Sequence, residues 1–203
     1  KGKKLGAESF KQVKTEASAQ RIPTGFSEVD DVLGGGLMPG GVVLLAGEPG
    51  IGKSTLLMQI ALTIGQERPV LYVSGEESAS QVKLRGDRLS KKAPERLSLA
   101  TSTSADDVAA TIASGDYALA VVDSMQTMAM AEIASAPGTV SQITNSANII
   151  IRAAKATNTA VVLVGHVTKE GSIAGPKVLE HLVDVVLQLE GERYGGFKLR
   201  RAA

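Results

Sequence analysis

One short stretch, Gly47-Glu48-Pro49-Gly50-Ile51-Gly52-Lys53-Ser54, constrains the fold of this chain more than any other part of it. It matches the pattern G-x-x-x-x-G-K-[ST]. It follows an apolar, β-branched run (Gly41–Ala46) and precedes a segment with apolar residues at helical spacing (Thr55–Gly65). A strand, a glycine-rich loop and a helix in this order form a P-loop, whose backbone N–H groups surround phosphate oxygens. The chain is therefore predicted to contain a nucleotide-binding α/β domain.

The residue types in this loop suit a nucleoside triphosphate bound with magnesium. The glycines permit a tight turn, and the N-terminus of the following helix adds a partial positive charge. Lys53 is expected to reach the β- and γ-phosphates and to act in catalysis, while the Ser54 hydroxyl is expected to bind Mg²⁺. The predicted ligands are thus ATP and Mg²⁺. The residues predicted to bind the nucleotide are Gly47, Glu48, Pro49, Gly50, Ile51, Gly52, Lys53, Ser54 and Thr55.

Near-continuous apolar runs alternate with amphipathic segments along residues 21–203, which predicts one α/β domain with a mostly parallel central sheet flanked by helices. The last two extended segments are joined by the turn GERYGG and predict a closing antiparallel hairpin. The predicted strands are Gly41–Ala46, Val70–Ser74, Leu119–Asp123, Ala160–Val164, Val183–Leu189 and Gly196–Arg201, and the predicted helices are Thr55–Gly65 and Val140–Thr157.

Carboxylates at the ends of predicted strands supply the remaining chemistry, because ligands bind at the C-terminal edge of such sheets. Asp123 is predicted to be the second Mg²⁺ ligand. Ser124 stands where many ATP-driven motors place a catalytic glutamate, so the general base is expected elsewhere. Glu76 is predicted to activate the attacking water, with Glu77 as the alternative. Both acids could instead simply favour the N-terminus of the next helix.

The end of the fourth buried run and the loop after it suggest sensing of the nucleotide and contact with DNA. His166 is predicted to sense the γ-phosphate, and a hydrogen-bonded structural role is the alternative. The glycine-rich loop that follows carries Lys169 and Lys177, which are candidates for contacts with the nucleic-acid backbone; ordinary solvated lysines are the alternative.

Composition excludes several classes of protein and site. Cysteine is absent, which excludes disulfides and thiolate metal sites, and the net charge of +1 does not by itself indicate nucleic-acid binding. No apolar run is long enough to span a membrane and no secretory signal is present, which favours a cytoplasmic location without membrane attachment. Residues 1–20 carry five lysines against two glutamates and no sustained apolar stripe, and are predicted to be a flexible basic linker.

From about residue 21 to the end, the chain resembles the bacterial RadA (Sms) family of DNA-repair ATPases. The stretches that carry the resemblance are RIPTGFSEVDDVLGGGLMPGGVVLLAGEPGIGKSTLL, VLYVSGEES, VVDSMQTM and GHVTKEGSIAGPKVLEHLVDVVLQLEGER. The resemblance implies a RecA-like P-loop NTPase fold and hexameric rings with ATP between protomers. It also implies ATP-driven movement on single-stranded and branched DNA, branch migration in recombinational repair alongside the RecA recombinase, and Glu76 as the catalytic glutamate.

Three features of that family are missing from the sequence: an N-terminal four-cysteine zinc module, a Lys-Asn-Arg-Phe-Gly motif expected after Ala203, and a C-terminal Lon-protease-like domain. The sequence is therefore expected to be part of a longer protein, whose basic motif would complete the ATP site of a neighbouring protomer. A regulatory ATP-binding switch of the circadian-clock ATPase type is the alternative function. A small-molecule kinase is less favoured because no arginine-rich lid segment is present.

Overall fold

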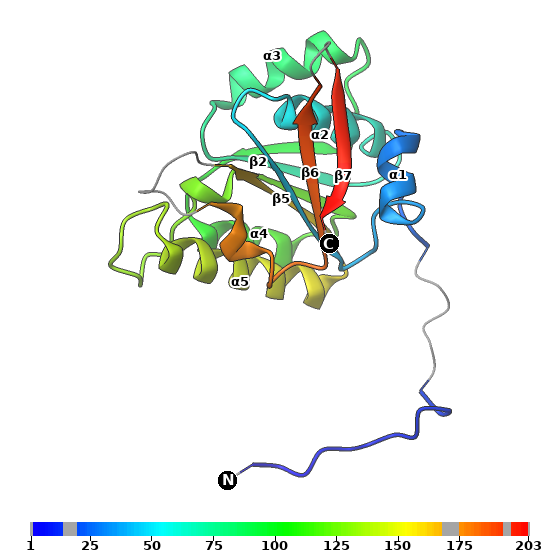
Figure 1. Ribbon diagram of the computed structural model, residues 1–203, viewed down its shortest axis with the longest axis vertical. Coiled ribbons are helices and arrows are strands. Elements are labelled where there is room, and N and C mark those ends of the chain that lie inside the picture. Colours follow the sequence, from blue (N-terminus) through cyan, green and yellow to red (C-terminus); the bar gives the residue numbers. More distant parts are fainter. Residues whose placement is uncertain (1, 14–19, 168–174, 193–195, 203) are drawn as a thin grey trace.

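The computed structural model describes residues 2–13, 20–167, 175–192 and 196–202. Residues 21–202 contain an α/β domain with a central sheet (Figure 1). In chain order its elements are α1 (Ser27–Leu33), β1 (Val42–Gly47), α2 (Lys53–Ile64), β2 (Val70–Ser74), α3 (Ala79–Leu89), β3 (Leu97–Thr101), α4 (Ala105–Ser114), β4 (Leu119–Asp123), the 3₁₀ helix η1 (Met125–Thr127), α5 (Val140–Thr157), β5 (Ala160–His166), the 3₁₀ helix η2 (Pro176–Leu179), β6 (Val185–Gly191) and β7 (Phe197–Ala202).

The seven strands form one sheet in the order β3-β2-β4-β5-β1-β6-β7. Every pairing is parallel except that of β6 with β7. The P-loop strand β1 therefore lies between β5 and β6, and the C-terminal ends of β1, β2, β4 and β5 share one edge of the sheet. The predicted parallel sheet with a closing antiparallel hairpin is confirmed.

Helices cover both faces of the sheet, which explains why its central strands are apolar except at their C-terminal ends. Helices α1, α2 and α3 pack on one face and α4 and α5 on the other (Figure 1). Alternate residues of each central strand enter the two cores: on β4, Val121 belongs to the core under α2, while Val122 belongs to the core under α5. All five residues of β2 and all five of β4 are buried. The sheet is therefore a rigid platform for its C-terminal edge.

The helix ends follow from local capping chemistry. The Ser78 hydroxyl accepts a hydrogen bond from Gln81 N, and the Gln81 side chain accepts one from Ser78 N, so a capping box begins α3. The Thr139 hydroxyl accepts a hydrogen bond from Gln142 N at the start of α5, and Asn158 ends that helix with a left-handed backbone (φ 55°).

Several of the sequence-based boundaries need correction by one or two residues. Helix α2 begins at Lys53, two residues earlier than predicted, because the P-loop lysine already belongs to the first helical turn. Strand β5 continues to His166, because β1 keeps pairing with it as far as Gly47. Strand β6 begins at Val185 rather than at residue 183. The sequence analysis also did not predict strand β3 or the helices α1 and α4. Strand β3 is an edge strand whose residues are at most partly buried and whose apolar pattern is weak.

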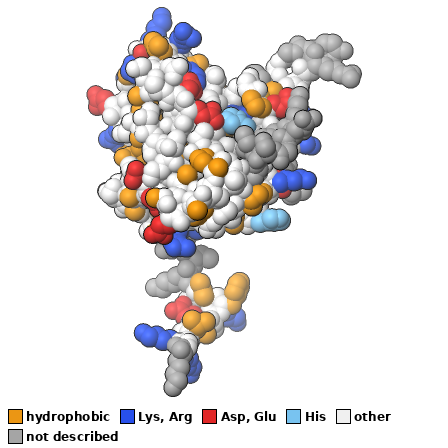
Figure 2. Space-filling model, turned by 90° about the vertical axis from the view of Figure 1, so that its left-hand side faces the viewer, with side chains coloured by type: hydrophobic (Ala, Val, Ile, Leu, Met, Phe, Trp, Pro, Cys, Tyr) orange, Lys and Arg blue, Asp and Glu red, His pale blue; other side chains and the backbone are white. Residues whose placement is uncertain are grey.

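The described part of the N-terminal segment, residues 2–13, extends away from the α/β body (Figures 1 and 2). Its lysine and apolar side chains stand clear of the body in Figure 2, and Phe10 is 96% exposed. Within the described residues, no helix is both long enough and apolar enough to cross a membrane.

Candidate nucleotide-binding and hydrolysis site

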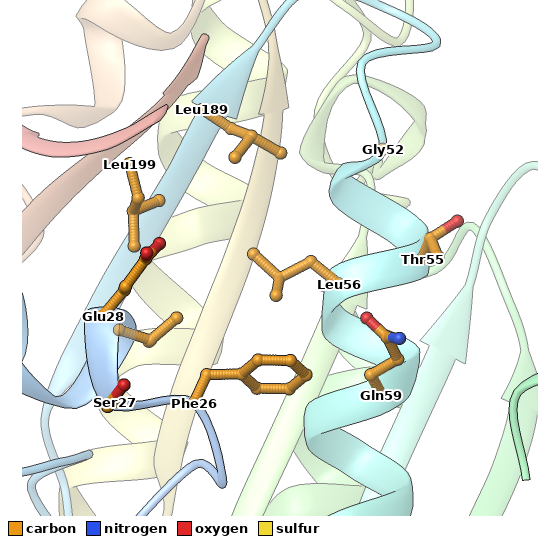
Figure 3. A pocket seen from close by; sticks show the side chains of 10 residues that line it. Phe26, Ser27, Glu28, Gly52, Thr55, Leu56, Gln59, Leu189 and Leu199 are labelled. Carbon is orange, nitrogen blue, oxygen red and sulfur yellow. The ribbon is translucent and has the colours of Figure 1, made fainter. Parts of the chain in front are cut away.

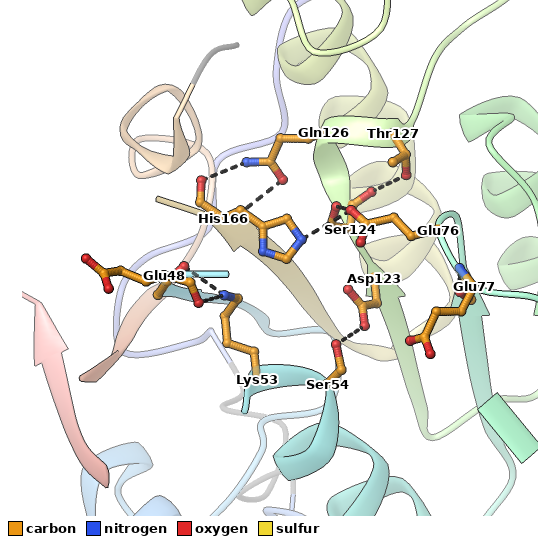
Figure 4. Close-up of polar contacts among 12 residues, drawn as sticks. Glu48, Lys53, Ser54, Glu76, Glu77, Asp123, Ser124, Gln126, Thr127 and His166 are labelled. Atoms are coloured by element: carbon orange, nitrogen blue, oxygen red, sulfur yellow. Dashed lines mark hydrogen bonds and ion pairs between the residues drawn. The ribbon is translucent and has the colours of Figure 1, made fainter. Parts of the chain in front are cut away.

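The P-loop joins β1 to α2 and holds its lysine inside the turn (Figure 4). Gly52, immediately before the helix, has φ 108°, a conformation that favours glycine. The Lys53 side chain lies beneath the loop, and Lys53 is 3% exposed. Its Nζ donates hydrogen bonds of 2.7 Å to the carbonyl oxygens of Gly47 and Glu48. The loop thus places the ammonium group where the sequence predicts phosphate oxygens to bind.

Burial makes the charged form of the Lys53 side chain energetically unfavourable in this position. Burial lowers the pKa of Lys53 below its ordinary value, and the nearby carboxylates of Asp123, Glu76 and Glu48 partly oppose that shift. Anionic phosphate oxygens beside the ammonium group would favour its charged form in the same way.

Ser54, at the start of α2, meets the end of β4. Its Oγ donates to Asp123 Oδ2 at 2.5 Å, and the same carboxylate oxygen accepts a 3.1 Å hydrogen bond from the Tyr72 hydroxyl. Tyr72 is fully buried on the neighbouring strand β2. Burial, together with the negative charge of Asp123, raises the pKa of Tyr72 far above its ordinary value, so its hydroxyl keeps its proton. Asp123 is therefore held by donors from α2 and β2.

A hydroxyl and a carboxylate oxygen at this spacing suit a hard cation such as Mg²⁺. Magnesium commonly takes only one or two carboxylates from a protein, with phosphate and water oxygens as its other ligands. Among the residues that the structure describes, no group of three or more His, Cys, Asp or Glu side chains could hold a metal by itself. Ser54 and Asp123 therefore fit a magnesium ion that is shared with a bound nucleotide.

Glu76 lies on the same edge of the sheet, in the loop between β2 and α3. Its Oε1 accepts a 2.8 Å hydrogen bond from Ser124 Oγ and is 3.2 Å from His166 Nε2 (Figure 4). The Glu76 side chain is 44% exposed, so water can reach the carboxylate, whereas that of His166 is 20% exposed. The sequence-predicted base and sensor are thus in direct contact. Ser124, noted in the sequence only because it is not a glutamate, holds the carboxylate of Glu76.

Glu77 points elsewhere. Its Oε1 is 2.7 Å from Nη1 of Arg85 on α3, and its backbone N–H donates to the Ser74 hydroxyl. The contacts of Glu77 therefore anchor the start of α3, which favours Glu76 over Glu77 as the candidate base.

Gln126 and Gly75, to which the sequence analysis gave no role, complete this edge. The Gln126 side chain bonds to both backbone groups of His166, donating to the carbonyl at 3.2 Å and accepting from the N–H at 3.3 Å. A Cβ added at Gly75 would lie 2.2 Å from Thr127 Oγ1, so the loop after β4 packs directly on the glycine beside Glu76. Neither contact can be predicted from a single sequence, because glutamine and glycine are common in loops that have no role at a functional site.

A largely apolar cavity of about 550 Å³ opens on the other side of α2 (Figure 3). Phe26 from the segment before α1, Leu56 from α2, and Leu189 and Leu199 from the hairpin line it, and Gly52 and Thr55 border it. The cavity adjoins the P-loop, but Asp123, Glu76 and His166 do not line it.

Lys169 lies outside the described residues. Lys177 lies in η2, which packs on α5 within the connection from β5 to β6, and it is exposed. Its exposure is compatible with the predicted contact with DNA.

Comparison with known proteins agrees with this geometry. Residues 8–172 match the model of a family described as AAA domain. The chain is 48% identical over 190 residues to the DNA repair protein RadA of Pseudomonas aeruginosa, a match that covers 92% of this chain and 42% of that protein. It is 50% identical over 181 residues to the DNA repair protein RadA of Mycobacterium tuberculosis (88% and 38%), and 46% identical over 183 residues to that of Bacillus subtilis (90% and 40%).

The chain therefore spans about two fifths of the length of these curated relatives. The family match covers most of the chain and includes the P-loop, the loop that carries Glu76, and the strand ends that carry Asp123 and His166. The chain thus belongs to the AAA domain family, with a RecA-like P-loop fold, and is a relative of the RadA DNA repair proteins.

Proposed function

We propose that this chain is the ATPase core of a DNA-dependent motor that acts on single-stranded DNA and on branched recombination intermediates in DNA repair. One observation carries the enzymatic part of the proposal: Glu76 Oε1 is held by Ser124 and His166 on the sheet edge that also carries Lys53, Ser54 and Asp123. A phosphate-binding loop and an oriented carboxylate on one edge are the parts that phosphoryl transfer to water requires.

In the proposed reaction each residue has a separate task. The P-loop N–H groups and Lys53 bind the β- and γ-phosphates, and the Lys53 ammonium group offsets the charge that develops on the γ-phosphate. When bound, Mg²⁺ would supply further neutralisation of phosphate charge, held by Ser54 and Asp123. Glu76 orients the attacking water and accepts its proton. Ser124 and His166 both contact Oε1 of Glu76. Neither residue contacts Oε2, the other oxygen of the carboxylate.

The DNA part of the proposal is supported by the relatives, which are named DNA repair proteins. We propose that the motor works as a hexameric ring with ATP between protomers, promotes branch migration, and acts alongside the RecA recombinase. Lys177 and Lys169 are the proposed contacts with the DNA backbone.

The decisive experiment measures ATP hydrolysis by the full-length protein in the presence of Mg²⁺, with and without single-stranded DNA of two unrelated sequences. We expect both DNAs to increase the rate, because backbone contacts do not depend on sequence. Slow hydrolysis that DNA does not change would instead indicate a regulatory switch of the circadian-clock ATPase type. A protein that binds but never hydrolyses ATP would refute the enzymatic assignment.

A further inference from the structure

The hydrogen bonds around His166 point to a further positioning residue at the proposed hydrolysis site. Strand β5 extends beyond β4: the last paired residues of that ladder are Val122 and Leu163, whereas β5 continues to His166. On the other side of β5, Gly47 of β1 is paired with His166, and the Gly47 carbonyl accepts a hydrogen bond from Val167 N. Because the N–H and C=O of one strand residue point to the same side, those of His166 face away from β1, toward the space beyond the end of β4.

The Gln126 side chain fills that space as a strand residue would. Its amide carries an N–H donor and a C=O acceptor side by side, the same two kinds of group that a peptide unit offers. Its Nε2 donates to the His166 carbonyl at 3.2 Å and its Oε1 accepts from the His166 N–H at 3.3 Å. The amide therefore continues the hydrogen bonding between β4 and β5 beyond the last residue of β4.

The turn η1, which carries Gln126, is firmly held in the structure. Gln126 belongs to η1, and both Met125 and Met128 are fully buried in the core under α5. The Thr127 hydroxyl also donates to the Ser124 carbonyl at 2.9 Å. The same short turn thus carries Gln126, which holds the backbone of His166, and adjoins Ser124, which bonds Glu76.

We propose that Gln126 is a positioning residue for the hydrolysis reaction. By clamping the backbone of His166, it keeps the imidazole Nε2 3.2 Å from Glu76 Oε1, so that Ser124 and His166 hold the candidate base from two sides. Gln126 acts through His166 and does not itself touch Glu76 in the described contacts. This inference rests on the proposed ATPase function.

A double-mutant cycle tests the route through His166. In the full-length protein we expect Gln126→Ala to slow single-turnover ATP hydrolysis by roughly 10- to 30-fold, as expected for the loss of two neutral hydrogen bonds. ATP affinity should stay near that of the wild type, because Gln126 is not part of the P-loop. In a His166→Ala background the same change should slow hydrolysis by less than about 2-fold. An equal loss in both backgrounds would show that Gln126 only supports the fold.

Two further variants control for general destabilisation. Gln142 is a buried glutamine whose side-chain amide, like that of Gln126, bonds only to backbone groups. They are those of Met130, Ile133 and Ser135, and none of these contacts involves Glu76 or His166. We expect Gln142→Ala to change the rate by the same factor in both backgrounds. Gln126→Glu keeps the size of the side chain and the acceptor oxygen. It replaces the N–H donor that bonds to the His166 carbonyl with a second acceptor oxygen. It should slow hydrolysis at least as much as Gln126→Ala.

NMR spectroscopy of the imidazole signals does not require ATP hydrolysis. It therefore distinguishes failure of this inference from failure of the proposed function. A His166→Ala variant assigns the His166 imidazole NMR signal, and a His181→Ala variant assigns that of His181, which is exposed. We expect Gln126→Ala to shift the His166 imidazole signal toward that of the exposed His181, whereas Gln142→Ala leaves it in place. An unchanged His166 signal would overturn the clamp even in a fully active enzyme. If the wild-type protein does not hydrolyse ATP, the proposed function fails, and the signal still reports whether Gln126 holds His166.

Discussion

The P-loop lysine is a buried cation whose hydrogen-bond acceptors in this structure are two carbonyl oxygens of its own loop. We expect Lys53→Ala to abolish tight binding of Mg-ATP, because the substitution removes the positive charge that faces the β- and γ-phosphates. Calorimetric titration with Mg-ATP measures the effect, with thermal unfolding as a control for the fold. Near-normal affinity in a folded variant would contradict the assignment of the P-loop.

The two adjacent acids after β2 make a matched pair of variants. Glu76→Gln should retain ATP but slow single-turnover hydrolysis by roughly 10²–10⁴-fold, the usual contribution of a general base. Glu77→Gln should have a much smaller effect, because Glu77 is engaged with Arg85 of α3. If only the Glu77 variant is slow, the base is Glu77, and Glu76 has the structural role.

At the scale of the elements, the loop after β2 packs closely against η1. A Cβ at Gly75 would lie 2.2 Å from Thr127 Oγ1 and 3.3 Å from Met128 Cε. We therefore expect Gly75→Ala to displace η1, lower the free energy of unfolding by about 1–3 kcal/mol and slow hydrolysis, since Ser124 and Glu76 move apart. Chemical denaturation and single-turnover rates measure the two effects.

A glycine within a helix gives the control. At Gly86 of α3, an added Cβ would lie 3.6 Å from Met58 Sδ, an ordinary contact. Gly86→Ala should therefore stabilise the protein by roughly 0.5–1 kcal/mol through helix propensity, without changing the rate. Adding Thr127→Ala to Gly75→Ala should restore part of the lost stability. If Gly75→Ala behaves like Gly86→Ala, η1 is not packed on Gly75 as described.

At the scale of the whole molecule, the prediction concerns the proposed contact of Lys177 with DNA. If Lys177 contacts a phosphate, Lys177→Ala should lower the slope of log affinity against log salt by about 0.7, for unrelated single-stranded sequences alike. ATP affinity should not change, since Lys177 is not part of the P-loop. Fluorescence anisotropy of labelled strands across a salt series, on the full-length protein, measures the slope.

Lys91 provides the comparison for that measurement. It is also exposed, but it lies in the α3–β3 connection, at the opposite edge of the sheet from the candidate site. Lys91→Ala should leave the salt slope unchanged. Equal slopes for the Lys177 and Lys91 variants and the wild type would place DNA binding elsewhere on the molecule.

The sequence by itself determined the parts of this protein that depend on local chemistry and on burial. The P-loop is recognisable because its glycines, lysine and serine act within eight consecutive residues. The central strands are recognisable because burial on both faces leaves mostly apolar residues, as in Val70–Ser74 and Leu119–Asp123, each of which is polar only at its last residue apart from the Tyr72 hydroxyl. The bounds of both strands were predicted correctly. The edge strand β3 was missed because its partly buried residues carry no such pattern.

Only the tertiary structure decided how the polar residues at the sheet edge combine. Glu76, Ser124, Gln126 and His166 come from three separate loops and strand ends, and their contacts depend on the strand order β2-β4-β5 and on the register of those strands. The choice between Glu76 and Glu77 likewise required the position of Arg85. Hydrogen bonds are directional and act over about 3 Å. The residues that make them across the sheet edge could therefore not be paired from the sequence, in which Gln126 and His166 are 40 positions apart.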